Sequence, residues 1–239
     1  MLHISIKSEE VFSFLGFTIT NSLLASYIVV AFFFILAVMF NEGFKNERSK
    51  FVFFILFVVG ALHSMFVSIL KDKTEKFFPL IASFFLFILL SNWFGLIPGV
   101  GSILIKREHG AVPVLRAATA DLNMTLALAL ISVVLMQFFG VKYLGLRGYL
   151  GKFINLSNPL NFFTGILEIV SEFSKIISFA FRLFGNIFAG EVLLLVVAFL
   201  IPILASFPFY LMEIFVGFIQ ALVFSMLTGA FLKMAISKH

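Results

Sequence analysis

Cysteine is absent from this 239-residue sequence, and charged residues make up only 12% of it. The lack of cysteine rules out disulfide bonds and thiolate metal sites, and it leaves the redox compartment open. The shortage of charge has a larger consequence, because soluble domains carry roughly 25% charged residues. A chain that is 62% hydrophobic cannot cover itself with polar surface, so its exterior must face lipid.

Apolar runs long enough to cross a hydrocarbon core of about 30 Å recur along most of the sequence. They predict an all-α, polytopic membrane protein with about five transmembrane helices, one interfacial helix on the cytoplasmic side, and a long tilted helical hairpin at the end. We interpret residues 1–239 as a single membrane domain. Its parts are an outer amino-terminal segment at 1–22, membrane helices at 23–40, 77–97, 122–139, 159–200 and 209–236, and the interfacial or re-entrant helix at 51–70.

The basic residues indicate the orientation of these helices. The net charge of +5 comes from short clusters between apolar runs and not from one continuous face, so no nucleic-acid partner is expected. Lys- and Arg-rich segments flank residues 51–70 on both sides, which predicts that this run stays at the cytoplasmic face. The amino terminus then lies outside and the carboxyl terminus in the cytoplasm. Lys106, Arg107 and Arg116 fall on the outer side, against this bias.

The last two helices are expected to form a hairpin, because Pro202 and Pro208 interrupt the helical pattern between them. The first helix of this hairpin carries a polar stripe. Its members are spaced by three or four residues and therefore share one face. They are Glu168, Ser171, Lys175, Ser178, Arg182 and Asn186.

Arg182 is the residue in this stripe that most needs an explanation. An arginine at the centre of a membrane helix costs at least about 2.5–3.5 kcal/mol, and Glu191, the nearest acid downstream, faces the other way. Snorkelling or a stabilising pair inside the chain is the alternative to a functional role. For Glu168, Glu172 and Lys175, a solvated helix end accounts for the sequence as well as a proton path does.

A second polar group consists of Glu191, Glu213 and Gln220. The two acids lie eleven residues on either side of Pro202, so a hairpin brings them to similar depth, about 16 Å from the turn. Carboxylates that face each other in a partly dry channel are expected to share a proton, whereas acids that face separate water titrate independently. Gln220 shares a helix face with Glu213, and polar contact between helices is the alternative role for it.

The segment from Arg182 to Glu191, which reads RLFGNIFAGE, closely resembles the signature of subunit a of F-type ATP synthases. Matches upstream and downstream extend the resemblance over nearly the whole chain. They comprise Leu167 and Glu168, Ser174 and Lys175, Gln220 and Ala221, Val223 and Phe224, and the run from Asp121 to Leu126.

The resemblance implies a proton-translocating stator subunit that is not itself an enzyme and needs no cofactor or metal. Arg182 would face the carboxylate of a rotating c-subunit ring, and a b-subunit stalk and the lipid bilayer would be the other partners. Asn186, Glu191, Glu213 and Gln220 would line the inlet half-channel, with Glu168, Lys175 and Ser178 near the cytoplasmic outlet. A bacterial plasma membrane is the implied location. Many family members have a histidine where this chain has Glu191 or Glu213, so a histidine relay is not implied.

Two other classes of function predict features that the sequence lacks. A secondary transporter that binds an anionic substrate at Arg182 should show repeats with matched broken helices. An intramembrane enzyme with Glu191 and Glu213 as acid and base should carry a nucleophile or metal motif as well. Neither set of features is present in the sequence.

Reporter fusions test the predicted orientation. Fusions at Arg48 and at Lys73, which flank residues 51–70, should both report a cytoplasmic position. Opposite readings at the two sites would show that residues 51–70 cross the membrane.

Overall fold

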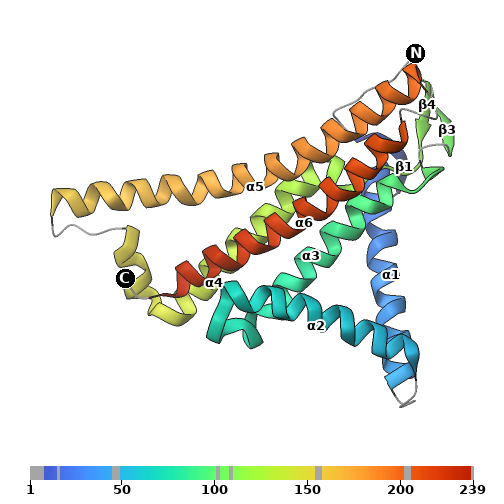
Figure 1. Ribbon diagram of the computed structural model, residues 1–239. Helices are drawn as coiled ribbons and strands as arrows, with labels where there is room; N and C mark the ends of the chain where they lie inside the picture. Colours follow the sequence, from blue (N-terminus) through green and yellow to red (C-terminus); the bar gives the residue numbers. More distant parts are fainter. Residues whose placement is uncertain are drawn as a thin grey trace.

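The computed structural model describes residues 8–14, 17–44, 49–100, 103–107, 110–153, 158–201 and 206–237. Long helices dominate these ranges (Figure 1). Five helical segments within them are long and apolar enough to cross a membrane, and they cover residues 21–44, 50–96, 122–153, 160–200 and 206–236. The predicted all-α, polytopic class is therefore confirmed.

Two short antiparallel hairpins lie at the same end of the helical bundle (Figure 1). β1 (Glu10–Phe14) pairs with β2 (Phe17–Thr20), and β3 (Leu104–Arg107) pairs with β4 (Gly110–Pro113). The sequence analysis expected no strands, since segments of four or five residues show no periodicity that distinguishes them from loops.

The first three helices form one side of the molecule. α1 (Asn21–Phe44) is followed by α2 (Lys50–Leu70), whose start is capped by the side chain of Ser49. The short helix η1 (Lys71–Lys73) then leads into α3 (Thr74–Leu96). α2 and α3 meet at η1 and diverge away from it, because the other end of α2 lies beside the end of α1 (Figure 1). α2 and α3 therefore do not pack side by side along their lengths. Arg48 lies outside the described residues.

α4 (Leu122–Phe153) is longer than the expected helix at 122–139 because the basic segment that follows it is also helical. Gly145 has φ 75°, a conformation that glycine adopts at little cost, and the chain reverses direction there. The reversal packs the ring of Tyr149 directly on Gly140, where a Cβ atom would overlap it. A glycine at position 140 thus allows the end of α4 to fold back.

The carboxyl-terminal hairpin consists of α5 (Pro159–Leu200) and α6 (Ser206–Ile236). α6 begins three residues before the expected start, because Pro208 lies in its first turn, where proline interrupts no backbone hydrogen bond of the helix. Pro202 and the rest of the turn lie outside the described residues. At 1.5 Å per residue α5 is about 63 Å long, twice the thickness of a hydrocarbon core, so it can stay in a membrane only at a steep inclination. Figure 1 shows α5 strongly inclined to α1.

Hydrogen bonds to backbone carbonyl groups join α3 to α6. Asn92 Nδ2 donates to the carbonyl of Gly217 at 2.8 Å, and Trp93 Nε1 donates to that of Ile214 at 3.0 Å. The hydroxyl of Tyr210 donates to the carbonyl of Leu96. These bonds fix the register of the two helices next to the β-hairpins.

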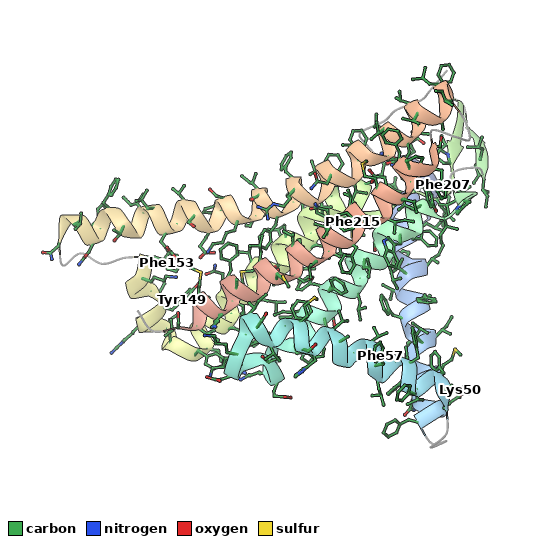
Figure 2. All side chains as sticks on the ribbon, viewed as in Figure 1. Lys50, Phe57, Tyr149, Phe153, Phe207 and Phe215 are labelled. Atoms are coloured by element: carbon green, nitrogen blue, oxygen red, sulfur yellow. The ribbon has the colours of Figure 1, made fainter. Side chains whose placement is uncertain are left out.

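The core lies between the end of α2 and helices α3, α4, α5 and α6, and it is rich in aromatic and aliphatic side chains. Its most completely buried members are Phe66, Leu70, Phe77, Ile81, Phe85, Ile88, Met136, Leu183 and Leu232. Large apolar side chains also project outward, including Phe57, Phe207 and Phe215, which are 64–67% exposed (Figure 2). A surface of this kind requires lipid or partner subunits around it.

Replacing Gly140 tests the fold-back of α4. Gly140→Ala should destabilise the protein by about 1–3 kcal/mol, because the added methyl overlaps the Tyr149 ring. Gly60→Ala is the matched control, since Gly60 lies within α2 and has no atom within 4 Å of its Cβ position. The control should be neutral or stabilising by up to about 1 kcal/mol, because alanine favours a helix more than glycine does. Thermal unfolding in detergent measures both, and equal melting temperatures would contradict the packing described.

Candidate functional site: an exposed arginine and a charged cavity

One face of α5 is exposed along several turns, and its residues recur at a spacing of three or four. The apolar members include Val170, Phe173, Ile177 and Phe181, and the polar members are Ser171, Ser174, Ser178, Arg182 and Asn186. Gly185 lies on the same face, with open space around its Cβ position. The face therefore has no side chain at Gly185, close to Arg182. Because about half of its members are polar, neither lipid alone nor water alone is a favourable environment for it.

Arg182 lies near the middle of α5 and is exposed. Its Nη2 donates a hydrogen bond of 3.1 Å to Ser178 Oγ, one turn earlier, as the spacing of the stripe predicts. Among the described residues no carboxylate lies within ion-pair distance of Arg182. Gln220 of α6 lines a small pocket beside it, together with Phe179, Leu183 and Phe224. The structure thus leaves this cation without an anion.

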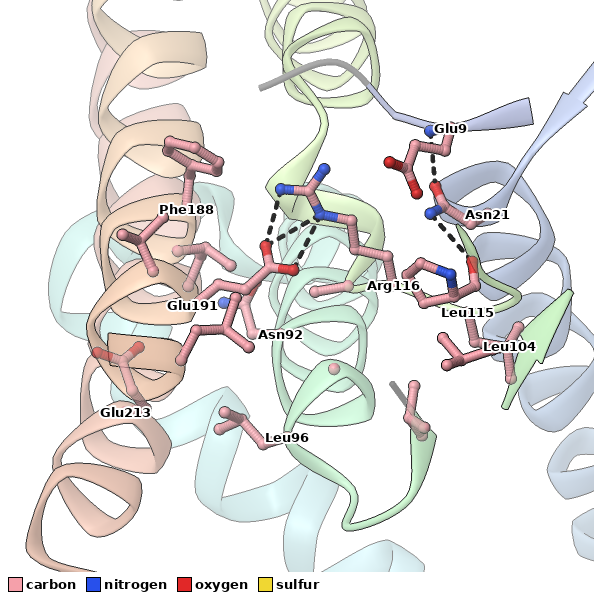
Figure 3. A pocket seen from close by; sticks show the side chains of 17 residues that line it. Glu9, Asn21, Asn92, Leu96, Leu104, Leu115, Arg116, Phe188, Glu191 and Glu213 are labelled. Atoms are coloured by element: carbon pink, nitrogen blue, oxygen red, sulfur yellow. Dashed lines mark hydrogen bonds and ion pairs between the residues drawn. The ribbon is translucent and has the colours of Figure 1, made fainter. Parts of the chain in front are cut away.

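A cavity of about 280 Å³ opens at the end of the bundle that carries the β-hairpins (Figure 3). Its walls come from the amino-terminal segment, α1, α3, the segment after β4, α5 and α6. Four ionisable residues line it, namely Glu9, Arg116, Glu191 and Glu213. Asn21 and Asn92 add neutral polar groups, and the remaining lining is largely aliphatic. The cavity is large enough to hold several water molecules.

Arg116 and Glu191 form a bidentate ion pair in the cavity wall (Figure 3). Arg116 Nη2 lies 2.9 Å from Glu191 Oε2, and Arg116 Nε lies 3.0 Å from both carboxylate oxygens. The guanidinium carbon is also 5.6 Å from the centre of the Phe188 ring. Arg116 is only 9% exposed, so the segment after β4 is held to α5 by a largely buried cation.

Glu213 lines the same cavity from α6 (Figure 3). It is 5% exposed, and its carboxylate packs against Gly190 so closely that a Cβ atom there would overlap it. Within the described residues it has no ion pair. Glu191 and Glu213 thus share a cavity, as the hairpin spacing predicted. However, Glu191 already has a cationic partner, so the two acids are not an isolated pair of like charges.

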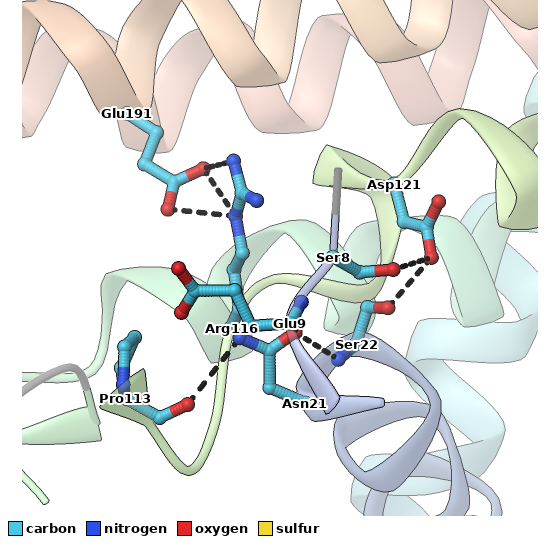
Figure 4. Close-up of polar contacts among 8 residues, drawn as sticks. All are labelled: Ser8, Glu9, Asn21, Ser22, Pro113, Arg116, Asp121 and Glu191. Carbon is cyan, nitrogen blue, oxygen red and sulfur yellow. Dashed lines mark hydrogen bonds and ion pairs between the residues drawn. The ribbon is translucent and has the colours of Figure 1, made fainter. Parts of the chain in front are cut away.

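Hydrogen bonds join the segments that surround the cavity (Figure 4). Asp121, at the start of α4, accepts hydrogen bonds from Ser8 Oγ at 2.8 Å and from Ser22 Oγ at 2.7 Å. Asn21 Nδ2 donates to the carbonyl of Pro113 at 3.3 Å. The amino-terminal segment, α1 and the segment after β4 are thereby held together around Arg116.

The other half of the polar stripe makes contacts within the chain. Glu168 pairs with Lys152, which is placed there by the reversal of α4, at 2.7 Å. Lys175 pairs with Glu172 at the same distance. Glu172 also accepts a hydrogen bond of 2.8 Å from Gln137, which in turn accepts one from Tyr149. Glu168 and Lys175 therefore have partners inside the chain, and Ser178 is the exposed member next to Arg182.

Comparison with known proteins identifies the family. A family model described as ATP synthase A chain matches residues 21–233, which include Arg182 and every ionisable residue of the cavity except Glu9. The chain belongs to the ATP synthase A chain family.

Similar proteins carry the same description. The chain is 33% identical to ATP synthase subunit a of Geotalea daltonii and 32% identical to that of Geotalea uraniireducens. Each match spans 211 residues, or 87% of this chain and 84% of the relative. A chloroplastic subunit a from Stigeoclonium helveticum is 36% identical over 170 residues, 71% of this chain and 65% of that protein. Membership confirms the resemblance found in the signature, and it associates the chain with proton transport and ATP synthesis by F-type ATP synthase.

The sequence analysis missed several residues of this ATP synthase A chain family member. Arg116 was treated only as a loop charge, although its place on the outer side, against the positive-inside bias, was a signal. Asp121 appeared only as part of the signature, and Asn92, Gln137 and Tyr149 were not considered. A lone polar residue in an apolar run does not reveal which distant segment it bonds.

Gly190 provides a test of the position of Glu213. Gly190→Ala should lower proton conduction by roughly tenfold, because its methyl group must displace the Glu213 carboxylate. Adding Glu213→Asp, which shortens the side chain by one methylene, should restore part of the loss, and Glu213→Asp alone is the control. Conduction is measured in vesicles from which the water-soluble part of the synthase has been removed. Absence of any recovery in the double variant would contradict the proposed clash.

Proposed function

We propose that this chain is the proton-translocating subunit a of an F-type ATP synthase, in which Arg182 separates two offset half-channels that open onto a rotating c-ring. The observation that carries the proposal is the exposed guanidinium of Arg182. It lies near the middle of a membrane helix and has only Ser178 as a hydrogen-bond partner among the described residues. A carboxylate on a neighbouring subunit would supply the missing anion, and such a carboxylate is what a c-ring carries in this family.

The inlet half-channel corresponds to the cavity and to the path from it toward Arg182. Glu213 lines the cavity, whereas Gln220 lines the pocket beside Arg182. They lie on the same face of α6, about 10 Å apart along its axis. Asn186 is exposed on α5, one turn after Arg182. A proton entering from the cavity would therefore pass Glu213 and reach the ring near Gln220 and Asn186.

The outlet half-channel corresponds to the exposed polar face of α5 on the other side of Arg182. Ser178 is exposed next to the arginine, and Ser174 and Ser171 continue the face toward the start of the helix. Glu168 and Lys175 flank this path, each held by its ion pair. Charges that are paired in this way can order water at the outlet without blocking it.

The chemistry requires no covalent step in this chain. A proton from the inlet neutralises a ring carboxylate, and the neutral form can then rotate into lipid, where the ionised form would be too costly. After nearly a full rotation the site meets the outlet and loses its proton, because Arg182 and water favour the ionised carboxylate. The fixed positive charge of Arg182 also repels a proton that would otherwise pass directly between the two half-channels.

The remaining surface accommodates the other components of the complex. The outward apolar faces of α1 and α2 include Phe34 and Phe53, which are 71% and 74% exposed, and would contact lipid and the b-subunit stalk. The cavity end would face outward, and the opposite end of the bundle, with the start of α3, would lie at the cytoplasmic face of a bacterial plasma membrane. The chain itself would not be catalytic.

Arg182→Ala tests the proposal directly. This variant should assemble with the ring but abolish proton-driven ATP synthesis, because the ring carboxylate loses its counter-charge and the barrier to leakage disappears. Arg182→Lys should substitute poorly, since an ammonium group lacks the planar fork of a guanidinium.

The matched control is Arg147→Ala, which removes an exposed arginine near the end of α4. ATP synthesis driven by an imposed proton gradient is measured in membrane vesicles, and copurification of the ring is checked in each variant. Normal coupled synthesis in Arg182→Ala vesicles would refute the proposal.

A further inference from the structure

The cavity contains two glutamates in opposite electrostatic surroundings. Both oxygens of Glu191 accept hydrogen bonds from Arg116, whereas Glu213 has no ion pair among the described residues. Glu9, at the amino-terminal side of the cavity, is the fourth ionisable group that faces them. The neighbouring parts of α1 and α3 contribute the neutral Asn21 and Asn92.

We propose that Arg116 is a positioning residue that holds Glu191 as a fixed ion pair in the cavity wall, so that Glu213 is the carboxylate that takes up protons and passes them on. This inference rests on the proposed function and divides the roles of two acids that the sequence presents as equivalent.

The geometry of Arg116 supports a fixed role. Its guanidinium is held on one side by the carboxylate of Glu191 and on another by the ring of Phe188, one turn earlier on α5. Bidentate arginine–carboxylate pairs are the most specific and among the strongest of side-chain hydrogen bonds. Arg116 itself is only 9% exposed, so water can replace little of what the Glu191 carboxylate provides.

A proton on Glu191 would therefore disrupt more than one bond. It would remove an acceptor from the guanidinium and leave a buried cation uncompensated, which is unfavourable. A proton on Glu213 disrupts no ion pair among the described residues. When two carboxyl groups share a site, such a difference in surroundings assigns them different tasks.

The test compares single and double replacements in the assembled complex. Arg116→Gln leaves the carboxylate of Glu191 without its cationic partner, and Glu191→Gln leaves Arg116 without its anionic partner. Each single variant should therefore lower passive proton conduction by roughly tenfold. The double variant replaces the ion pair by two neutral amides that can bond each other, and its conduction should lie within about threefold of the unmodified protein. Glu213→Gln should abolish conduction. Adding Arg116→Gln or Glu191→Gln to this variant should not restore it.

The dependence of conduction on inlet pH gives a second readout that a purely structural role would not alter. The unmodified protein and the double variant should have the same midpoint, because Glu213 sets it in both. Arg116→Gln alone should shift the midpoint, because the charge of Glu191 then acts on Glu213 without compensation by Arg116. Controls are Arg147→Gln, which removes an exposed arginine, and Glu75→Gln, which removes an acid with a 94% exposed side chain. Both should leave the profile unchanged.

The double variant decides the question, whether or not the single variants assemble. Conduction as low as in Glu213→Gln, a shifted midpoint, or failure to assemble with the ring would overturn the assignment and return Glu191 to the relay. The proposed function fails separately, if Glu213→Gln conducts normally and Arg182→Ala sustains ATP synthesis. If Glu213→Gln loses conduction and Arg182→Ala loses ATP synthesis, an inactive double variant of Arg116 and Glu191 would refute only the proposed role of Arg116.

Discussion

A hydrocarbon core offers no hydrogen bonds, and this constraint accounts for the way in which the helices meet. Several polar side chains that lie between them find partners on another helix. Asn92 bonds the backbone of α6, and Ser132 of α4 lies 3.0 Å from the hydroxyl of Thr228 on α6. Gln137 of α4 bonds Glu172 of α5. A few polar contacts therefore select which apolar faces pack together and in which register, although apolar burial supplies most of the contact area.

Arg182 departs from this pattern, and the departure has a functional meaning. Its neighbours at the start of α5, Glu168 and Lys175, are each held by an opposite charge. Within the part of the chain that the structure describes, the one hydrogen-bond partner of Arg182 is a neutral hydroxyl on its own helix, on a face where Gly185 leaves open space. An isolated subunit could not keep such a group in lipid cheaply. In the proposed assembly, a carboxylate brought to the exposed face of α5 would offset this cost.

The length and inclination of the hairpin connect this arginine to the charged cavity. A helix perpendicular to the membrane would need only about 20 residues, whereas α5 has 42. Its inclination lets one helix carry the cavity acid Glu191, the central Arg182 and the ion pairs near its start, at different depths and lateral positions. In the proposed function, this geometry would let two aqueous paths approach the same arginine from opposite faces of the membrane without meeting.

The sequence by itself determined the membrane class, the number of long helices and the polar stripe around Arg182, because each depends on composition or on local periodicity. Spacing also predicted that Glu191 and Glu213 lie at similar depth, and the structure places both at one cavity. Only the tertiary structure showed that Arg116 pairs with Glu191, that Asn92 bonds the backbone of α6, and that the Tyr149 ring packs on Gly140. The partners in these contacts lie on segments far apart in the chain, and no local pattern encodes which of them meet. Helix rotation and the reversal at Gly145 decide those meetings, and both follow from packing over the whole bundle.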